Sequence, residues 1–490
     1  MPPTHEVLQP ASSSPRSPST AGGTGPGGLD GFFRISERGS TVAREFRGGL
    51  ATFFTMAYIV VLNPIILGSG VDKFGQKLSV GQVTTATALV AAVMTLIMGV
   101  GGNLPLAIAS GLGLNAVVAF QLAPQMSWPD AMGLVVIEGL GICILVATGA
   151  RQAIMDAIPM ALKQSISVGI GLFIAFIGFV DSGFVSRIPD AASSTVPVQL
   201  GLTGRLTGWP VVVFCLGVLL TLALLVRRVK GAILLSIIAM TILAVIIEAL
   251  ATIKSWGLTT PKYKGIVGQP DFGLFGHFSL FGAVAHVGML TAVIFAFTLI
   301  LSDFFDAMGT IIGVTNEAGL LDRTGRLPGI GRVLFIDGLA ASAGGIASAS
   351  SNTCFIESAA GVGEGARTGL ANVFTAAFFV VALFLTPLTT IVPSQAASPA
   401  LVAVGFLLMQ QVKDIPWDEW DIAIPAFLTI VLMPFSYSIT NGIGAGMISY
   451  ALFKLVRGRA GEVHVLVWVV AILFAIYFAL NPITQWLGIS

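Results

Sequence analysis

The chain has 490 residues, of which 55% are hydrophobic and only 10% are charged, and its formal net charge is +1. A soluble protein carries about 25% charged residues, so this composition excludes an ordinary soluble fold and indicates an all-α polytopic membrane protein. The near-neutral charge balance gives no indication of nucleic-acid binding, and the three cysteines and four histidines lack the spacing of a metal site or a disulfide framework.

The N-terminal segment differs from the rest of the chain in composition. Residues 1–30 are rich in Pro, Ser, Thr and Gly, which predicts a disordered cytoplasmic tail that we extend to residue 40. Residues 31–46 have the pattern of a short amphipathic segment at the membrane surface. The tail has no apolar core of signal-peptide length, so we expect the first transmembrane helix to direct insertion.

Two series of apolar segments follow, separated by a polar connector at about residues 254–285. The first series lies at about 47–69, 83–100, 104–120, 130–149, 160–180, 209–226 and 230–253. The second lies at about 287–314, 333–347, 348–362, 368–393, 399–411, 422–438 and 440–457. Residues 464–482 form one further apolar stretch, and the sequence does not decide whether it spans the membrane.

The third segment of each series is short and broken by glycine or small polar residues, at 104–120 and 348–362. An odd number of segments in each half inverts the second half relative to the first. Broken segments at corresponding places in two inverted halves are typical of a transporter binding site. The sequence therefore predicts a seven-plus-seven inverted repeat with a site where the two broken segments meet.

The distribution of basic residues tests the orientation of these segments. With the N-terminus in the cytoplasm, 18 of the 25 Lys and Arg residues fall on the inside and 7 on the outside. Because cytoplasmic loops carry an excess of Lys and Arg, this distribution favours a cytoplasmic N-terminus.

Three acidic residues in charge-poor segments are the main candidates for function. Asp303 and Asp306 are three residues apart and so share one face of a helix, and Glu357 follows the polar run 348–353. A carboxylate at bilayer depth costs roughly 2.5–3.5 kcal/mol, so such residues are rare unless a polar partner meets them. The alternative is that an aspartate caps a helix break or binds neighbouring backbone.

We expect the polar run 348–353 to cap a half-helix whose dipole favours Glu357 in its first turns. The corresponding part of the first half is Gly111 to Asn115, where glycine permits close approach to a ligand and the Asn115 amide offers a donor and an acceptor. Packing between helices is the alternative role for Asn115. We expect Glu138 to form a structural hydrogen bond and Asp337 to reach the membrane interface.

The ligand of such a site follows from its charge. Carboxylates without a nearby intramembrane Lys or Arg argue against an anion, and suit a cation or a neutral molecule with N–H donors, such as a planar heterocycle. Burial of a carboxylate also favours its protonated form, so one of these acids is a candidate site for a coupling proton.

Several stretches together resemble a known family, the nucleobase/cation symporters related to uracil and xanthine permeases, and within it the AzgA-like purine permeases. The resemblance runs over nearly all of the chain after residue 40. It is carried by EFRGGLATFFTMAYIVVLNP (45–64), SGLGLNA (110–116), ALKQSISVGIGLFIAFIG (161–178), SDFFDAMGTIIGV (302–314), CFIESAAGVGEGARTGL (354–370) and PFSYSITNGIGAG (434–446).

The resemblance implies fourteen transmembrane segments, with short strands in the broken third and tenth segments. It also implies that the chain is divided into domains. The core domain comprises residues 41–150 and 286–395, and the gate domain comprises 151–253 and 396–460. An extracellular connector spans 254–285, and a C-terminal apolar segment spans 461–490. It further implies proton-coupled import of hypoxanthine, adenine or guanine across the plasma membrane, without a cofactor or a metal. Homodimers are known in the wider superfamily, so a homodimer is an expected assembly.

The resemblance also assigns site residues. Asp303 and Glu357 match the family's substrate-binding carboxylates and are the expected proton-coupling residues; Asn115 matches its third-segment asparagine and Asp306 a second acid linked to purine selection. We also place Gly111, Thr353 and Phe355 in the substrate site. The chain departs from the family at Phe355, where tyrosine is common.

Two other classes of protein are alternatives to a purine permease. Sulfate and bicarbonate transporters share the seven-plus-seven plan, but an anion site predicts a basic residue or bare amide dipoles in place of the acids. An enzyme or a receptor would need a nucleophile with its base, metal ligands or a soluble domain, and the sequence shows no such feature.

Overall fold

A computed structural model of the chain describes residues 28–149, 157–188, 198–201, 203–251, 256, 261, 265–322 and 326–486. Most of the predicted disordered tail and the connector residues 252–255, 257–260 and 262–264 lie outside the described residues. Within the described part, nine helices are long and apolar enough to cross a membrane. The prediction of a mostly helical, multi-pass membrane protein is confirmed.

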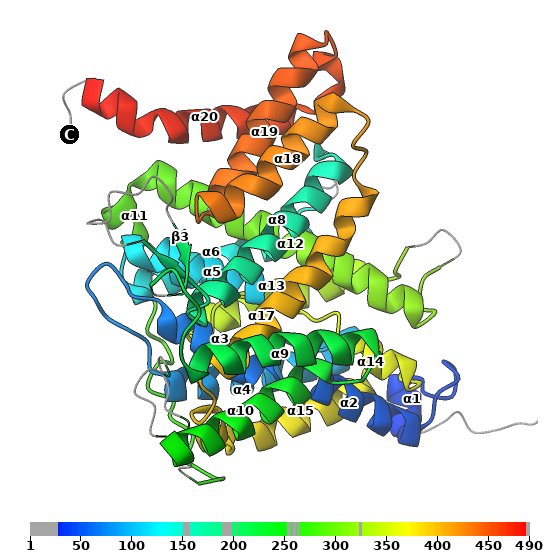
Figure 1. The fold of residues 1–490 in the computed structure, drawn as a ribbon. Helices are drawn as coiled ribbons and strands as arrows, with labels where there is room; N and C mark the ends of the chain where they lie inside the picture. The colour runs from blue at the N-terminus through cyan, green and yellow to red at the C-terminus, as the bar shows by residue number, and fades with distance from the viewer. Residues whose placement is uncertain are drawn as a thin grey trace, which may run out of the picture.

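The helices follow the two predicted series (Figure 1). The first half contains α1 (Leu29–Phe33), α2 (Val42–Met56), α3 (Ile59–Ser69), α4 (Val80–Ile97), α5 (Leu112–Val117), α6 (Trp128–Ala147), α8 (Met160–Asp181), α9 (Trp209–Val226) and α10 (Ala232–Ala251). The second half contains α11 (Gly282–Val287), α12 (Met289–Glu317), α13 (Ile330–Ile346), α14 (Ser358–Gly363), α15 (Leu370–Leu383), α16 (Thr386–Thr389), α17 (Ser394–Met409), α18 (Trp420–Phe435), α19 (Ile439–Val456) and α20 (Val465–Trp486).

The first predicted segment is interrupted. The sequence predicts one helix at about 47–69, but α2 ends at Met56 and α3 begins at Ile59. Thr41 caps α2 by accepting a hydrogen bond from the backbone N–H of Arg44. Pro64 inside α3 has no N–H to donate to the preceding turn, which weakens the helix just after the interruption. Ala57 and Tyr58 keep right-handed helical dihedral angles, so the two helices form a single 28-residue span, Val42–Ser69, with Tyr58 at the junction.

Two short strands lie in the broken segments. β1 (Ile108–Ser110) precedes α5, and β4 (Asn352–Cys354) precedes α14; they pair antiparallel, with Ala109 opposite Thr353. Backbone groups inside a bilayer must find partners within the protein. The two broken segments therefore satisfy each other's backbone, which ties the first half of the chain to the second.

The helices around the strand pair pack closely. α13 packs against α6 and β4, and α15 packs against α2 and α4. A second group consists of α8, α9, α10, α17, α18 and α19, in which α17 packs on α8 and α9, and α18 packs on α19. Figure 1 shows α18, α19 and α20 gathered at one end of the view.

The structure adds detail between α8 and α9 and at the C-terminal apolar stretch. A hairpin of β2 (Val185–Arg187) and β3 (Val198–Leu200) lies between α8 and α9. The undecided stretch 464–482 is part of the helix α20, which packs against α19 and α12.

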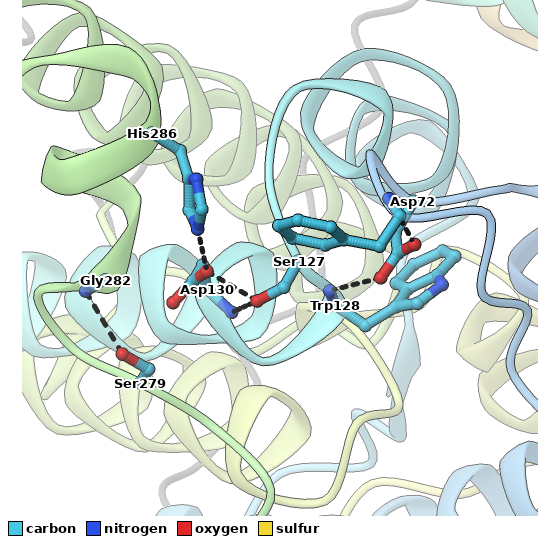
Figure 2. Close-up of polar contacts among 8 residues, drawn as sticks. Asp72, Ser127, Trp128, Asp130, Ser279, Gly282 and His286 are labelled. Atoms are coloured by element: carbon cyan, nitrogen blue, oxygen red, sulfur yellow. Dashed lines mark hydrogen bonds and ion pairs between the residues drawn. The ribbon is translucent and has the colours of Figure 1, made fainter.

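The start of α6 is held by polar contacts (Figure 2). Ser127 Oγ donates a 2.5 Å hydrogen bond to Asp130 Oδ2, and His286 Nε2 of α11 lies 3.3 Å from the same oxygen. The backbone N–H of Trp128 faces Asp72 Oδ2 at 3.4 Å. These contacts fix the position of α6, which carries Glu138 toward the strand pair.

Candidate functional site

The strand pair brings the two predicted parts of the site together. Beyond the strands, the backbone N–H of Gly111 donates to the Ser351 carbonyl at 2.9 Å, and that of Phe355 donates to the Ala107 carbonyl at 2.9 Å. Four of the predicted site residues lie on or next to this pair: Gly111, Asn115, Thr353 and Phe355. Residues about 240 positions apart in the chain are thus joined by backbone hydrogen bonds.

Glu357 is the residue directly before α14 and is half-buried. Its Oε1 accepts a 2.5 Å hydrogen bond from the phenolic O–H of Tyr58. Thr55 Oγ1 donates to the Glu357 backbone carbonyl at 3.3 Å. Sequence reasoning missed Tyr58 as a site residue, because a neutral aromatic in an apolar run gives no signal of charge or of a broken helix.

Asp303 and Asp306 differ in their surroundings although they are one helical turn apart on α12. Asp303 is fully buried, and neither of its carboxylate oxygens accepts a hydrogen bond of standard geometry from the described residues, although the Thr353 side chain lies within reach of this carboxylate. Asp306 is exposed and lies within electrostatic range of Glu357. The two aspartates therefore differ in exposure, with Asp306 accessible near Glu357 and Asp303 buried, and the roles predicted for both stay predictions.

Asn115 lies on α5 and is fully buried. Its Oδ1 accepts a 2.9 Å hydrogen bond from Ser110 Oγ, while its Nδ2 has no partner within the described residues. A buried amide N–H₂ group without an acceptor is costly. The unpaired Nδ2 is consistent with the predicted contact of Asn115 with a ligand, which stays a prediction.

The polar run 348–353 does not cap α14, so that expectation is wrong. α14 has no side-chain cap, because the run ends inside β4 (Asn352–Cys354), with residues 354–357 between it and Ser358, where the helix begins. Ser348 and Ser350 adopt positive φ angles of 57° and 63°, a conformation uncommon outside glycine, and they turn the chain from α13 into β4. Two side chains of the run, Ser351 and Thr353, instead form hydrogen bonds with acids on α6 and α13.

Two further acids, Asp337 and Glu138, form hydrogen bonds with β4 and with Ser351 just before it. Asp337 Oδ1 on α13 accepts hydrogen bonds from the backbone N–H of Cys354 at 2.9 Å and from Thr353 Oγ1 at 3.3 Å. Glu138 Oε1 on α6 accepts one from Ser351 Oγ at 2.9 Å. The expectation that Asp337 reaches the interface is wrong, since it is fully buried. Glu138 does form the structural hydrogen bond expected of it.

The site is acidic. Within the described part of the chain, no Lys or Arg forms an ion pair with Glu138, Asp303, Asp306, Asp337 or Glu357; the pairs that are present lie elsewhere, such as Lys230 with Glu364. Lys163 of α8 approaches α12 over the Phe305 ring, 5.4 Å from its centroid. No group of three or more metal-ligating residues occurs among the described residues. The arrangement suits a ligand that donates hydrogen bonds.

Comparisons with known proteins agree with the sequence resemblance. A family model described as the permease family matches residues 43–444. The guanine/hypoxanthine permease PbuO of Bacillus subtilis (strain 168) is 39% identical over 451 residues, which are 91% of this chain and 99% of that protein. The adenine permease AdeP of Escherichia coli (strain K12) is 36% identical over 456 residues, which are 92% of this chain and 96% of that protein.

Solved structures support the fold alone. The transmembrane domain of the cyanobacterial bicarbonate transporter BicA superposes with a TM-score of 0.57 at 16% identity, over 82% of this chain and 96% of that chain. An inward-facing murine anion transporter, Slc26a9, gives a TM-score of 0.58 at 11% identity, over 85% of this chain and 68% of that chain. The chain therefore belongs to the permease family, as the resemblance predicts, and is a multi-pass membrane transporter rather than an enzyme.

Proposed function

We propose that this permease imports purine nucleobases together with protons across the cell membrane. The observation that carries the proposal is that Asn115 and Glu357 follow the two paired strands, with Asp306 near Glu357, and that no Lys or Arg among the described residues forms an ion pair with either acid. A purine base is planar and presents N–H donors beside carbonyl or ring-nitrogen acceptors, so carboxylates and an amide complement it. The names of the relatives, adenine and guanine/hypoxanthine permeases, support the same class of substrate.

The residues have distinct proposed roles. Glu357 accepts hydrogen bonds from the purine and is oriented by Tyr58, while Asn115 donates from its unpaired Nδ2. Asp306, accessible beside Glu357, selects among purines. Gly111, Thr353 and Phe355 shape the pocket at the strand pair, and Asp303 with Glu357 takes part in proton coupling.

Transport requires movement of the site between the two sides of the membrane. We assign fourteen spans in a seven-plus-seven inverted repeat, with the core domain (41–150 and 286–395) moving against the gate domain (151–253 and 396–460). The packing of α13, α15 and the strand pair into one group, and of α8, α17, α18 and α19 into another, supports this division. The excess of Lys and Arg on the inside supports a cytoplasmic N-terminus.

The test is uptake of radiolabelled hypoxanthine, adenine and guanine by cells that lack their own purine uptake. We expect saturable uptake that a protonophore abolishes and that Glu357→Gln removes. The matched control is Glu248→Gln, because Glu248 is a buried acid away from the site that accepts a 2.8 Å hydrogen bond from Trp256 Nε1. Uptake by Glu357→Gln at the level of the control contradicts the binding role.

A further inference from the structure

The strongest unexplained feature is a set of three buried carboxyl groups behind β4. Glu138 comes from α6, Asp303 from α12 and Asp337 from α13, and all three side chains are fully buried. The three carboxyl groups lie within electrostatic range of one another. They are on the side of the strand from which Ser351 and Thr353 donate, and Glu138 has no place in the substrate site described above.

The hydrogen bonds to these groups are incomplete. Glu138 Oε2, Asp337 Oδ2 and both oxygens of Asp303 accept no hydrogen bond of standard geometry from the described residues. Three carboxylates that are buried together without a cation are far less stable than a set that holds protons, because each buried charge loses its hydration and repels the others. Protonation of one oxygen also turns an acceptor into an O–H donor that can satisfy its neighbour.

The packing keeps these groups in place. Glu138 lies next to Gly139, where an added Cβ would fall 2.3 Å from the Gly338 carbonyl oxygen and 2.4 Å from the Ser342 backbone nitrogen. α6 and α13 are therefore in backbone contact at the level of Glu138 and Asp337, and neither side chain can turn away to water without separating the helices. This rigidity suits a group that must bind a proton inside the protein.

We propose that Glu138, Asp337 and Asp303 form a buried proton-binding site behind β4, separate from Glu357 and Asp306, which meet the substrate. A proton taken from water forms an O–H bond on one of the carboxylate oxygens and is shared by hydrogen bonding with the next. Release breaks that bond and returns the proton to water on the other side of the membrane. Ser351 and Thr353 form hydrogen bonds with these acids, so protonation of the site changes the contacts of β4, the strand that leads to Glu357.

The titratable groups that face Glu138 are few. Asp337 faces it from α13 and Asp303 from α12, and the Cys354 thiol of β4 faces Asp337 and Asp303. On α12, Asp306 also acts on Asp303 and Asp337 from the substrate side. His286 of α11 meets the far end of α6 at Asp130. No lysine or arginine within the described residues forms an ion pair with this set.

The inference rests on the proposed proton-coupled transport, and Glu138→Gln tests it. The glutamine keeps an oxygen acceptor for Ser351 Oγ but cannot be charged, so a purely structural role is preserved. Removal of one carboxylate relieves repulsion on Asp303 and Asp337, and these then lose their protons more readily. We expect half-maximal purine uptake to move to a more acidic external pH, with uptake at neutral pH reduced about tenfold for each unit of that shift.

A control variant and the results that would overturn the proposal complete this test. Glu248→Gln should leave the pH profile unchanged. A profile of Glu138→Gln that coincides with the wild type overturns the proposal, and so does uptake that follows external sodium instead of pH. Failure of the wild type to take up any purine would instead contradict the proposed function.

A second measurement covers the case in which Glu138→Gln does not fold. Infrared spectroscopy of the purified wild-type protein, with and without hypoxanthine, detects the C=O stretch of protonated carboxyl groups directly. We expect this band to persist at neutral pH and, where the variant is obtained, to be weaker in Glu138→Gln. A wild-type spectrum without the band at neutral pH overturns the proposal whether or not uptake is observed.

Discussion

Tyr58 and Glu357 are joined by a 2.5 Å hydrogen bond although they lie 299 positions apart in the chain. The tyrosine stands at the interruption between α2 and α3, and the glutamate stands directly before α14. Tyr58 lies at the junction of two helices of one span and Glu357 at the start of a short helix, and the bond fixes one carboxylate oxygen of Glu357. The other oxygen remains for a ligand. This relationship makes Tyr58 the positioning residue of the proposed substrate site.

Tyr58→Phe should weaken purine uptake while leaving the fold intact. A hydrogen bond to a charged group contributes about 1.5–3 kcal/mol, which corresponds to about a 10- to 100-fold higher KM. The measurement is the concentration dependence of hypoxanthine uptake, with protein amounts in the membrane equalised. Tyr477→Phe on α20 is the control, since Tyr477 is only partly buried and contacts Phe295 and Phe478. An unchanged KM in Tyr58→Phe would remove Tyr58 from the site.

Asp306→Asn should change the choice of purine more than the rate of transport. Asp306 is exposed beside Glu357, so an amide there offers both a donor and an acceptor where the carboxylate only accepts. We expect the order of inhibition among unlabelled hypoxanthine, adenine and guanine to change in competition with one labelled purine. Glu248→Gln is the control and should not alter this order, because Glu248 lies away from the site, where it accepts a hydrogen bond from Trp256. The same order in wild type and Asp306→Asn argues against a role in selection.

Most of the helical plan could be predicted from hydropathy, but the contacts inside the site could not. An acidic residue in an apolar segment is a recognisable candidate for function because burying its charge in the membrane is costly. Asp303, Asp306 and Glu357 are identified in this way. Tyr58 carries no such cost and its segment looks continuous, so its role depends on a partner far along the chain. The burial of Asp337 could not be predicted, because its position near a helix end does not reveal that the β4 backbone covers its side chain.

Gly344→Ala should prevent folding, whereas Gly309→Ala should be tolerated. A Cβ at Gly344 would lie 1.9 Å from the Ser350 carbonyl oxygen and 2.2 Å from Asn352 Nδ2, in the turn that leads into β4. At Gly309 of α12, nothing lies within 4 Å. Size-exclusion chromatography of fluorescently tagged proteins checks the pair. We expect Gly344→Ala to aggregate and Gly309→Ala to elute as the wild type does; a normal profile for Gly344→Ala would contradict the described turn.

Glu45→Ala should destabilise the protein strongly. The Glu45 carboxylate is fully buried and accepts backbone N–H bonds from Arg367 at 2.9 Å, Ala371 at 3.2 Å and Thr368 at 3.3 Å. It thereby caps the start of α15 from α2. Loss of this cap leaves buried donors unpaired, at a cost of about 3 kcal/mol or more. Thermal unfolding in detergent measures the effect.

The control for Glu45 is Glu37→Ala. Glu37 is exposed and faces Arg34 at 3.8 Å, a surface pair expected to contribute at most about 1 kcal/mol. A midpoint of unfolding for Glu45→Ala equal to that of Glu37→Ala would show that α15 does not depend on this cap.

The most direct test of the central claim uses purified protein in liposomes with an imposed proton gradient, acidic outside. The account predicts accumulation of labelled purine in wild-type liposomes above the external concentration, collapse of that accumulation on addition of a protonophore, and no accumulation with Glu357→Gln. Accumulation that is equal with and without the proton gradient, or equal in wild type and Glu357→Gln, would contradict it.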